Sequence, residues 1–411
     1  MSAMKPLEGI KVIEQSVMVA SACAGRMMAD FGAEVIKVED ARGGDPMRKW
    51  AAGIGAPIDE LCNPIFDNLN ANKQGLSIDL KSEEGREVFY KLLENADVFL
   101  TNNRTEALER MGLDYATLHA KFPKLVVTQL EGYGAKGPEA SRPGYDSTAF
   151  WARSGFMSSQ ATYGDDGSGY PVYMPMGFGD ATCALGMVSA TLAAVLAARQ
   201  TGIGDHVTTS LYGMSIWLAN IMVTGSQFGF HMNKKRSESS PFGAPFRCKD
   251  GYWFMPQVVN FARDHEAYYR ILGCDDMCDD PIYAARANFN KVEVSKPVIE
   301  RFDKVYATKT AKEWQELFVA NNMSCEILAE YEDILTDEQA LANDFVYEMT
   351  YPNGKTVKLC RTPLRSENMG LPEFNRGPLL GEHTAAILAD LGISDEAIKE
   401  LQAKGVIKQH D

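Results

Sequence analysis

The sequence lacks the residue spacings that mark most metal and redox centres. Its six histidines lie far apart in the chain, and no two of them have the spacing of metal ligands. Of the eight cysteines only Cys274 and Cys278 are near neighbours, and their spacing is neither a zinc motif nor a redox motif. We therefore expect no metal site, and we expect mostly buried, reduced thiols in a cytoplasmic protein.

The common nucleotide-binding fingerprints are also missing. No Gly-x-Gly-x-x-Gly opens a helix after the first expected strand, and no Walker loop occurs in the chain. The first turn, at 15–22, instead reads QSVMVASA. This turn disfavours an NAD-dependent enzyme.

Positive charge is scarce. Lysine and arginine number 41 against 55 aspartates and glutamates, a net charge of −14, and there is no long basic run. Since affinity for a polyanion depends on clustered cations, we expect no nucleic-acid partner. Residues 1–8 are polar and contain a proline, so we expect no secretory signal peptide. The run at 181–198 is long enough to cross a membrane, but its Ala, Thr, Ser and Gly content favours a buried core helix and no membrane partner.

What is present is a regular alternation of strands and helices. At 411 residues two domains are the default expectation. The first ~130 residues predict an α/β fold, a Rossmann-like and mostly parallel sheet with ligands beyond the carboxyl ends of its strands. The expected strands are 9–14, 34–39, 75–80, 97–101 and 125–130, and the expected helices are 20–32, 82–96 and 105–111.

The later part of the chain predicts a smaller α+β domain at 225–325. A strand at 206–210 and an apolar helix at 211–222 come before a polar connector at 225–240. Beyond the connector, 246–256 reads as a strand–turn–strand, followed by helices at 262–272, 295–306 and 310–321. The pattern at 383–403 predicts one final amphipathic helix.

Asp180 is the candidate reactive group. It follows the turn Gly177-Phe178-Gly179 and begins a long run of small apolar helix formers. Local sequence favours a helix N-cap, because Asp is common there. The alternative is a nucleophile, kept ionised by the positive helix end and the free N–H groups around it.

Several stretches, spread over nearly the whole chain, match the motifs of one family. In order they are PLEGIKVIE, DFGAEVIKVE, ANKQGLSIDLKSEEGREVFYKLLENADVFLTN, TEALERMGLDY, PKLVVTQLEGYGAKGP, RPGYDSTAFWARSG, GFGDATCALG and PLLGEHTAAILADLGISDEAIKEL. Each alone is weak, but the combination is specific. On these residues the chain resembles the family III CoA-transferases, most weakly at 225–330.

The resemblance implies both an architecture and a reaction. It implies an interlocked homodimer, with a large domain at 1–224 and 326–411 and a small domain at 225–325 between these segments. It implies that Asp180 attacks an acyl-CoA, passes through mixed anhydrides and carries CoA as an aspartyl thioester. Coenzyme A and acyl-CoA are then substrates, a small carboxylic acid is the other partner, and no tightly bound cofactor is needed.

The resemblance also implies contacts with CoA. Val19 and Ala20 match a loop that touches CoA through its backbone. The positions that match the adenine and phosphate path are Ile78, Asp79, Lys81, Asn102 and Arg110. Arg42 is a candidate by proximity, because the aligned position of a CoA-binding arginine in relatives is Asp40 here.

Around the nucleophile, Tyr145 and Asp146 match a pair in which the acidic member orients the attacking carboxylate. Asp146 is alternatively structural, because two close carboxylates raise one pKa unless hydrogen bonds compensate. Gly179 and the exposed helix start are suitable N–H donors for a developing oxyanion.

Within the family, the motifs look most like the subgroup that handles (R)-2-hydroxy acids such as phenyllactate and 2-hydroxyisocaproate in amino-acid fermentation. Two alternatives stay open. A 2-methylacyl-CoA racemase needs an acid/base pair, and the racemases that resemble this chain have histidine where Tyr145 stands. A non-catalytic CoA-binding protein would not need Asp180.

Overall fold

The computed structural model describes residues 5–163, 168–232, 235–362, 367–368, 370 and 374–410. The chain divides into two compact units. Unit 1 comprises Met1–Phe156, Met174–Ile221 and Glu338–Asp411, and unit 2 comprises Met157–Tyr173 and Met222–Asp337. The predicted division at 225–325 differs from this mainly in 157–173 and 326–337, which group with unit 2.

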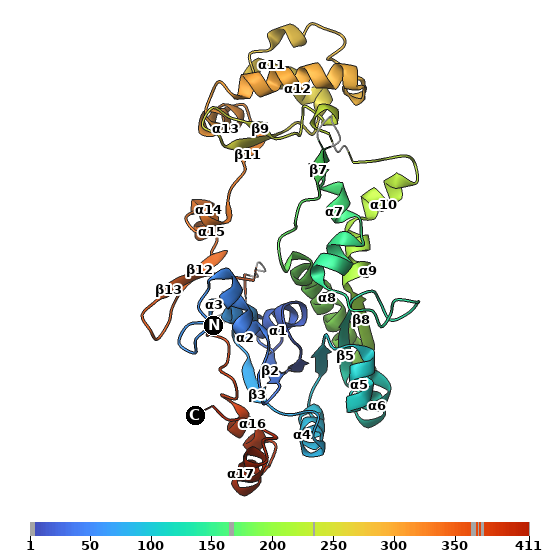
Figure 1. The fold of residues 1–411 in the computed structure, drawn as a ribbon, viewed down its shortest axis with the longest axis vertical. Coiled ribbons are helices and arrows are strands. Elements are labelled where there is room, and N and C mark those ends of the chain that lie inside the picture. The colour runs from blue at the N-terminus through green and yellow to red at the C-terminus, as the bar shows by residue number, and fades with distance from the viewer. Residues whose placement is uncertain are drawn as a thin grey trace. The chain divides into compact units, whose positions relative to one another are not determined.

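Unit 1 is built on a six-stranded sheet in which every neighbouring pair is parallel (Figure 1). The strands are β1 (Lys11–Gln15), β2 (Glu34–Glu39), β3 (Gln74–Ser77), β4 (Val98–Thr101), β5 (Val126–Glu131) and β8 (His206–Ser210). Their order is β3-β2-β1-β4-β5-β8, so the winding direction reverses between β1 and β4. This confirms the predicted α/β class and the mostly parallel, Rossmann-like sheet.

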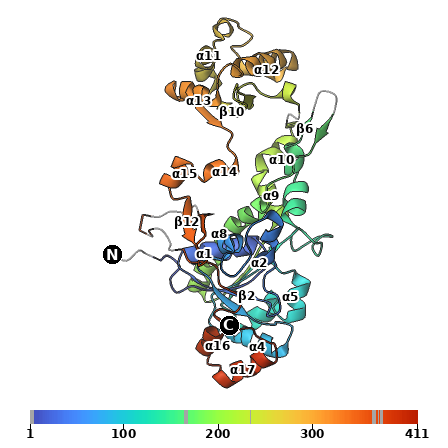
Figure 2. The same ribbon diagram turned by 60° about the vertical axis from the view of Figure 1, so that its left-hand side comes forward.

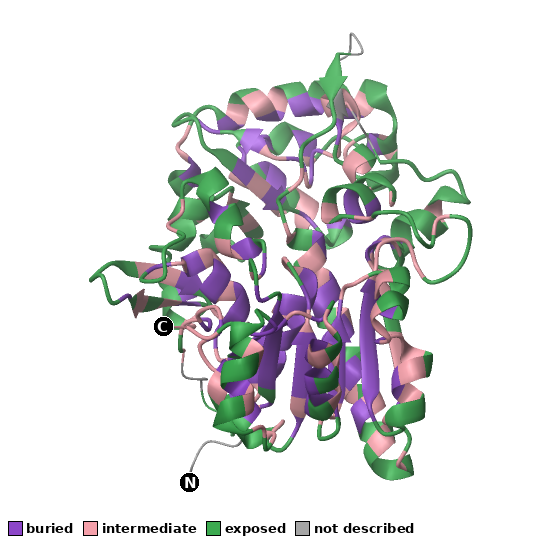
Figure 3. Cartoon of the chain, turned by 60° about the horizontal axis from the view of Figure 1, so that its bottom comes forward, coloured by how far each residue is buried: buried purple, intermediate pink, exposed green. Residues whose placement is uncertain are grey.

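Helices cover both faces of this sheet. On one face α1 (Ala20–Asp30) and α8 (Phe178–Thr201) pack against each other and against the strands. On the other face, one apolar core joins the strands to α4 (Glu83–Leu93), α5 (Thr105–Met111), α6 (Tyr115–Lys121), α16 (Thr384–Asp390) and α17 (Asp395–Ala403) (Figure 2). Strands covered on both faces must be apolar on both sides, and every residue of β4 is buried. The strands of the sheet are largely purple, the colour of buried residues, in Figure 3.

The prediction of a single helix at 383–403 is wrong. α16 ends before Gly392, which adopts the left-handed conformation at φ 73°. α17 then begins with its own cap, because the Ala397 N–H donates to Ser394 Oγ at 3.3 Å. The apolar spacing continues across the break because both helices pack on the same core.

α8 is the one helix among the described residues that is long and apolar enough to cross a membrane, by length and composition only. Its buried residues include Cys183, Met187, Thr191 and Val195, which recur at helical spacing. This stripe lies against α1, β5 and β8. One face of α8 therefore packs into the core, although only 39% of its most apolar 18-residue window is buried.

The remaining described elements of unit 1 are short. A hairpin of β12 (Val346–Thr350) and β13 (Thr356–Cys360) turns at 352–354, where the sequence is Pro-Asn-Gly. The helical elements are α2 (Met47–Trp50), η1 (Ala51–Ile54), α3 (Pro64–Asn70), η2 (Asp146–Ala152), α9 (Leu211–Leu218) and α15 (Glu338–Ala342). α10 (Asn220–Ser226) and α7 (Phe156–Ser159) lie at the boundaries of the two units.

Unit 2 is an α+β unit with an aromatic core. Its antiparallel sheet has the order β11-β10-β9, formed by β9 (Phe246–Arg247), β10 (Trp253–Gln257) and β11 (Ser324–Ile327). Its other elements are η3 (Arg236–Glu238), α11 (Phe261–Ile271), η4 (Asp275–Met277), η5 (Arg286–Asn290), α12 (Val292–Tyr306), α13 (Ala311–Ala320), α14 (Tyr331–Ile334) and the pair β6 (Thr162–Tyr163) and β7 (Gly169–Tyr170). The predicted strand–turn–strand and the three predicted helices are all present.

Candidate active site

A cavity of about 670 Å³ opens in unit 1 at the carboxyl ends of β1, β4 and β5. It lies where the strand order reverses, which is where open parallel sheets bind ligands. Its lining includes the predicted residues Val19, Ala20, Asn102, Arg110, Tyr145, Asp146 and Asp180. Residues from four separate stretches of sequence therefore meet around one space.

Asp180 is presented by the first turn of α8, but it is not the cap of that helix. α8 begins at Phe178, and its N-cap is Gly177, which is left-handed at φ 74°. Asp180 is thus the third helical residue. The local prediction of a helix N-cap is wrong, because the glycine turn starts the helix two residues earlier than the aspartate.

Asp146 serves the α8 N-terminus instead. Its Oδ2 accepts a hydrogen bond from the Gly177 N–H at 2.9 Å. Asp146 is the first residue of η2, a π-helical segment, and such segments are frequent at functional sites. A carboxylate placed here interacts favourably with the positive end of the helix.

Gly179 is required by close packing. A Cβ at this position would lie 2.2 Å from Asp146 Oδ1 and 2.4 Å from the Phe150 ring. Gly179 is buried and does not line the cavity. Only glycine fits at this position, because any side chain would collide with Asp146.

Burial and mutual repulsion alter the acidity of the two carboxyl groups. Burial, and to a smaller extent the charge of the nearby Asp146, together raise the pKa of Asp180 to about 7. Burial also raises the pKa of Asp146, while the backbone N–H groups of Gly177 and Gly179 oppose that rise. Both effects act against the expectation that the helix end keeps Asp180 ionised.

The loop between β1 and α1 forms a second wall of the cavity. Val19 is the N-cap of α1 and Ala20 its first residue, and no side chain caps this helix start. The Asn102 side chain holds the loop from the end of β4. Its Oδ1 accepts from the Val17 N–H at 3.1 Å, and its Nδ2 donates to the Val17 carbonyl at 2.7 Å. Asn102 therefore shapes the loop as well as lining the cavity.

Three arginines face this cavity, of which sequence reasoning identified only Arg110. Arg104 precedes α5, two residues after Asn102. Arg142 precedes Tyr145 in the RPGYD motif and pairs with Glu139 at 2.6 Å. Both arginines lie within three residues of a predicted site residue in the sequence, and this closeness could have identified them as candidates. Guanidinium groups suit phosphates by charge and hydrogen-bond geometry.

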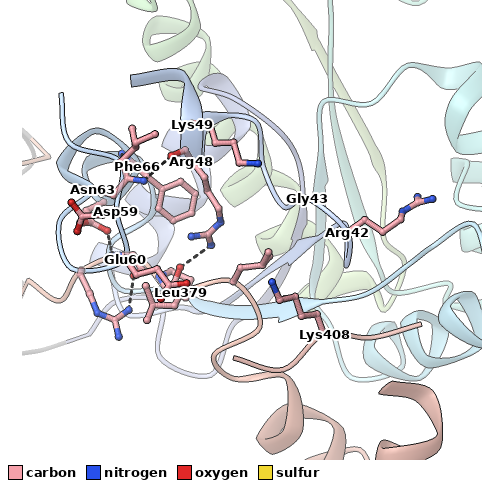
Figure 4. A pocket seen from close by; sticks show the side chains of 16 residues that line it. Arg42, Gly43, Arg48, Lys49, Asp59, Glu60, Asn63, Phe66, Leu379 and Lys408 are labelled. Carbon is pink, nitrogen blue, oxygen red and sulfur yellow. Dashed lines mark hydrogen bonds between the residues drawn. The ribbon is translucent and has the colours of Figure 1, made fainter. Parts of the chain in front are cut away.

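The other predicted CoA contacts lie apart from this cavity. Arg42 lines a separate cavity of about 250 Å³, as do Arg48 and Lys408, and its side chain points away from these two (Figure 4). The Arg42 guanidinium pairs with Asp40 at 2.9 Å and lies 3.6 Å from Asp79. Asp79 in turn accepts from the Lys81 N–H at 2.9 Å.

Ile78 is buried and forms a β-bridge with Ile407. Ile78, Asp79 and Lys81 line neither of these two cavities. They belong to the carboxyl end of β3, two strands away from β1 in the sheet.

The Asp180 cavity is not equipped for metal or histidine chemistry in the described part of the chain. None of its described lining residues is a histidine. Among the described residues no group of three or more His, Cys, Asp and Glu could hold a metal ion. Tyr145, which is 67% exposed, also lines this cavity.

Comparison with known proteins identifies the family. The model of CoA-transferase family III matches residues 7–384. The chain is 35% identical over 407 residues to (R)-2-hydroxy-4-methylpentanoate CoA-transferase of Clostridioides difficile, covering 98% of this chain and 99% of the relative. It is 37% identical over 399 residues to cinnamoyl-CoA:phenyllactate CoA-transferase of Clostridium sporogenes, covering 96% and 95%.

The fold comparison agrees. The crystal structure of a CAIB/BAIF family protein from Brucella suis superposes with a TM-score of 0.76 at 29% identity, covering 94% of this chain and 99% of that one. These matches span both units and the whole length of the curated relatives. The chain therefore belongs to CoA-transferase family III and is an enzyme of that type.

Proposed function

We propose that this enzyme moves CoA from an acyl-CoA or enoyl-CoA to an (R)-2-hydroxy acid, with Asp180 as the covalent carrier. The observation that carries the proposal is the position of Asp180. Its half-buried carboxylate lines the same cavity as the start of α1 and three arginines. Two relatives whose names specify a 2-hydroxy acid support the substrate class.

The reaction needs only anionic nucleophiles. The Asp180 carboxylate attacks the thioester carbon of the donor, and the C–S bond breaks to give a mixed anhydride and CoA thiolate. The thiolate attacks the Asp180 carbonyl carbon, which releases the donor acid and leaves CoA as an aspartyl thioester. The acceptor carboxylate then attacks that thioester, and the released thiolate takes the acceptor acyl group from the second anhydride.

In this scheme the backbone at Val19 and Ala20 contacts CoA, and the arginines hold its phosphates. Arg110 is the predicted partner, and Arg104 and Arg142 line the same space. The adenosine end extends along the carboxyl ends of β2 and β3, where Arg42, Asp79 and Lys81 lie close together. Asp146 orients Asp180 by holding the start of α8. No tightly bound cofactor takes part.

We further infer an interlocked homodimer, with large and small domains bounded near 225–325, working in the cytoplasm in amino-acid fermentation. Support for the dimer comes from apolar side chains left exposed on one chain. Leu196 on α8 is 61% exposed and Trp217 on α9 is 71% exposed. All eight cysteines are free, as suits a reducing compartment.

The deciding experiment is intact-protein mass spectrometry after incubation with cinnamoyl-CoA and no acceptor acid. The proposal expects an increment equal to CoA less one water, located on the peptide that contains Asp180. Added (R)-phenyllactate should discharge it and yield phenyllactyl-CoA. An unmodified protein, or CoA on another side chain, would reject the proposal.

A further inference from the structure

The loop that forms one wall of the Asp180 cavity contains a strained residue. Met18 is left-handed, at φ 66°, although it is not a glycine. This conformation costs a residue with a side chain roughly 1 kcal/mol, so the surrounding structure must hold it. Val17, Met18 and Val19 all line the cavity, so the strained residue is part of the wall.

The group that holds Met18 is Asp45, which follows β2 and is 1% exposed. Asp45 Oδ1 accepts from the Met18 N–H at 3.0 Å and from the Met47 N–H at 2.9 Å. The Asp45 N–H donates to Glu39 Oε2 at 2.8 Å. A single buried oxygen thus ties the cavity loop to the loop after β2.

Asp45 is itself fixed by a buried network of charges. Lys37 Nζ lies 2.9 Å from Asp45 Oδ2 and 3.1 Å from Glu14 Oε1. Glu14 Oε2 in turn lies 2.7 Å from Lys73 Nζ. These four side chains form a row of alternating sign that runs beneath the loop, from Asp45 through Lys37 and Glu14 to Lys73.

The helix α1 leaves room for this row. A Cβ on Gly25 would lie 2.0 Å from Glu14 Oε2. At the end of the row, Lys73 Nζ donates a hydrogen bond to the Ala22 carbonyl of α1 at 2.8 Å. The network therefore contacts α1 as well as the loop before it.

Such a network is a poor source of stability. Removing charged groups from water costs several kcal/mol per ion. A protein with apolar side chains of similar size in place of a buried ion pair is therefore often equally stable or more stable. What it does provide is a defined geometry for the groups it touches. Those groups are the backbone of Met18 and the first turn of α1, whose N–H groups have no side-chain cap.

We propose that Asp45 is a positioning residue for the CoA thioester. Its carboxylate holds Met18 in the left-handed conformation, so that the loop and the uncapped start of α1 face the cavity in the orientation that CoA requires. The inference rests on the proposed function, because it assigns this cavity to CoA. Asp45 does not touch the reacting atoms and acts through the Met18 N–H.

The test is a double-mutant cycle with Asp45→Ala and Met18→Gly. Glycine adopts φ 66° without strain, so it should compensate for the lost carboxylate. We expect D45A to raise both the KM for acyl-CoA and the dissociation constant of CoA, measured by calorimetry, by ~10–100-fold. M18G is measured alone as the reference of the cycle, and M18G added to D45A should lower both constants at least threefold relative to D45A.

Asp30→Asn is the matched control. Asp30 is also a buried carboxylate in an ion pair, with Arg26 at 2.9 Å, but it does not line the cavity. D30N should lower Tm and leave both constants within twofold of wild type. If D45A does not fold, D45L and D45L/M18G replace it, because leucine is close to aspartate in shape but cannot accept the Met18 N–H.

Two outcomes would overturn the inference. One is a folded Asp45 variant with wild-type constants. The other is an Asp45 variant with raised constants that M18G does not lower, since Asp45 would then act on the fold and not through Met18. Failure of the proposed function is a separate result, in which the wild type binds CoA but forms no aspartyl thioester.

Discussion

At the scale of single residues, the properties of Asp180 follow from its surroundings more than from its type. A carboxylate in water is ionised above pH ~4, whereas burial and the Asp146 charge raise the pKa of Asp180 to about 7. A carboxylate of higher pKa is a stronger nucleophile once ionised. Because this pKa lies near physiological pH, only part of the Asp180 population is ionised at neutral pH.

Replacement of Asp180 by asparagine should abolish transfer. The amide has the same shape but cannot form the mixed anhydride, so the rate should fall at least ~10³-fold. Steady-state assays and intact mass would measure the loss of turnover and of the CoA adduct. Asp205→Asn, outside the cavity lining, is the matched control and should retain both. Transfer by D180N at a wild-type rate would favour a CoA-binding protein without Asp180 chemistry.

The rate should depend on pH through Asp180. Because only the ionised carboxylate attacks, kcat/KM for acyl-CoA should rise with pH and level off above an apparent pKa near 7. Stopped assays from pH 5.5 to 8.5 would measure the profile. A flat profile over this range would show that Asp180 ionisation does not limit attack.

Stability should respond to the same ionisation. The folded pKa of about 7 lies above the usual 3.8, so this group's stabilising contribution is complete below pH 3.8 and is lost as pH rises through 7. Asparagine does not titrate. The stability of D180N relative to wild type should therefore increase between pH 4 and 7 and then stay constant, with a total gain of roughly 4 kcal/mol because the pKa rises from 3.8 to about 7 on folding. Urea unfolding at pH 4, 6 and 8 would measure it, and an equal difference at all three pH values would contradict it.

At the scale of elements, the start of α8 and η2 form one structure. Gly177 begins the helix, Asp146 accepts its N–H, and Gly179 lets the two segments touch. The two segments are more than 30 positions apart in sequence, so only the sheet beneath them brings them together. The placement of Asp180 depends on this contact.

Two glycines of α8 allow a matched test of that contact. A Cβ at Gly179 meets the Asp146 carboxylate and the Phe150 ring, whereas a Cβ at Gly186 meets the flexible end of Met214 at 2.0 Å. Gly179→Ala should cut transfer at least tenfold and lower Tm. Gly186→Ala should leave the transfer rate within threefold of wild type, because the end of the Met214 side chain can move aside. It should not lower Tm as Gly179→Ala does, because alanine favours a helix by up to ~1 kcal/mol over glycine. Equal behaviour of the two variants would show that the α8–η2 contact is not needed.

At the scale of the whole molecule, one chain leaves apolar surface on α8 and α9 that a second copy would cover. Light scattering coupled to size exclusion should give twice the 45.3 kDa of one chain. Leu196→Glu should shift this mass towards the monomer or lower Tm, because it places a charge on the exposed apolar face. Lys91→Glu on α4 is a charge control that should remain dimeric. A monomeric wild type would reject the homodimer.

Much of the fold was predictable from local pattern. The strands at 34–39 and 206–210 and the helix at 105–111 were predicted at the bounds they have. The strand at 34–39 is the clearest case, because it is a short, largely apolar run that is buried after its first residue. The final helix was predicted as one element, since an apolar spacing that continues on the same core hides the break at Gly392. Strand order could not be derived from spacing alone.

The candidate site was predictable only in part. The motifs led to Asp180, Asn102 and Arg110, which do line one cavity. They also grouped Arg42 and Lys81 with these residues, although those two lie at the ends of β2 and β3, outside that cavity. Local sequence at Asp180 favoured a cap, because it does not reveal that Gly177 starts the helix and that Asp146 accepts its N–H.

The sequence by itself therefore determined the α/β class, the family and the identity of the candidate nucleophile. Periodicity and motif order are properties of the chain that need no third dimension. Only the tertiary structure decided which carboxylate serves the α8 N-terminus, that the pKa of Asp180 rises, and that Asp45 reaches Met18. Burial and electrostatics depend on distances between residues remote in sequence, and folding alone sets those distances.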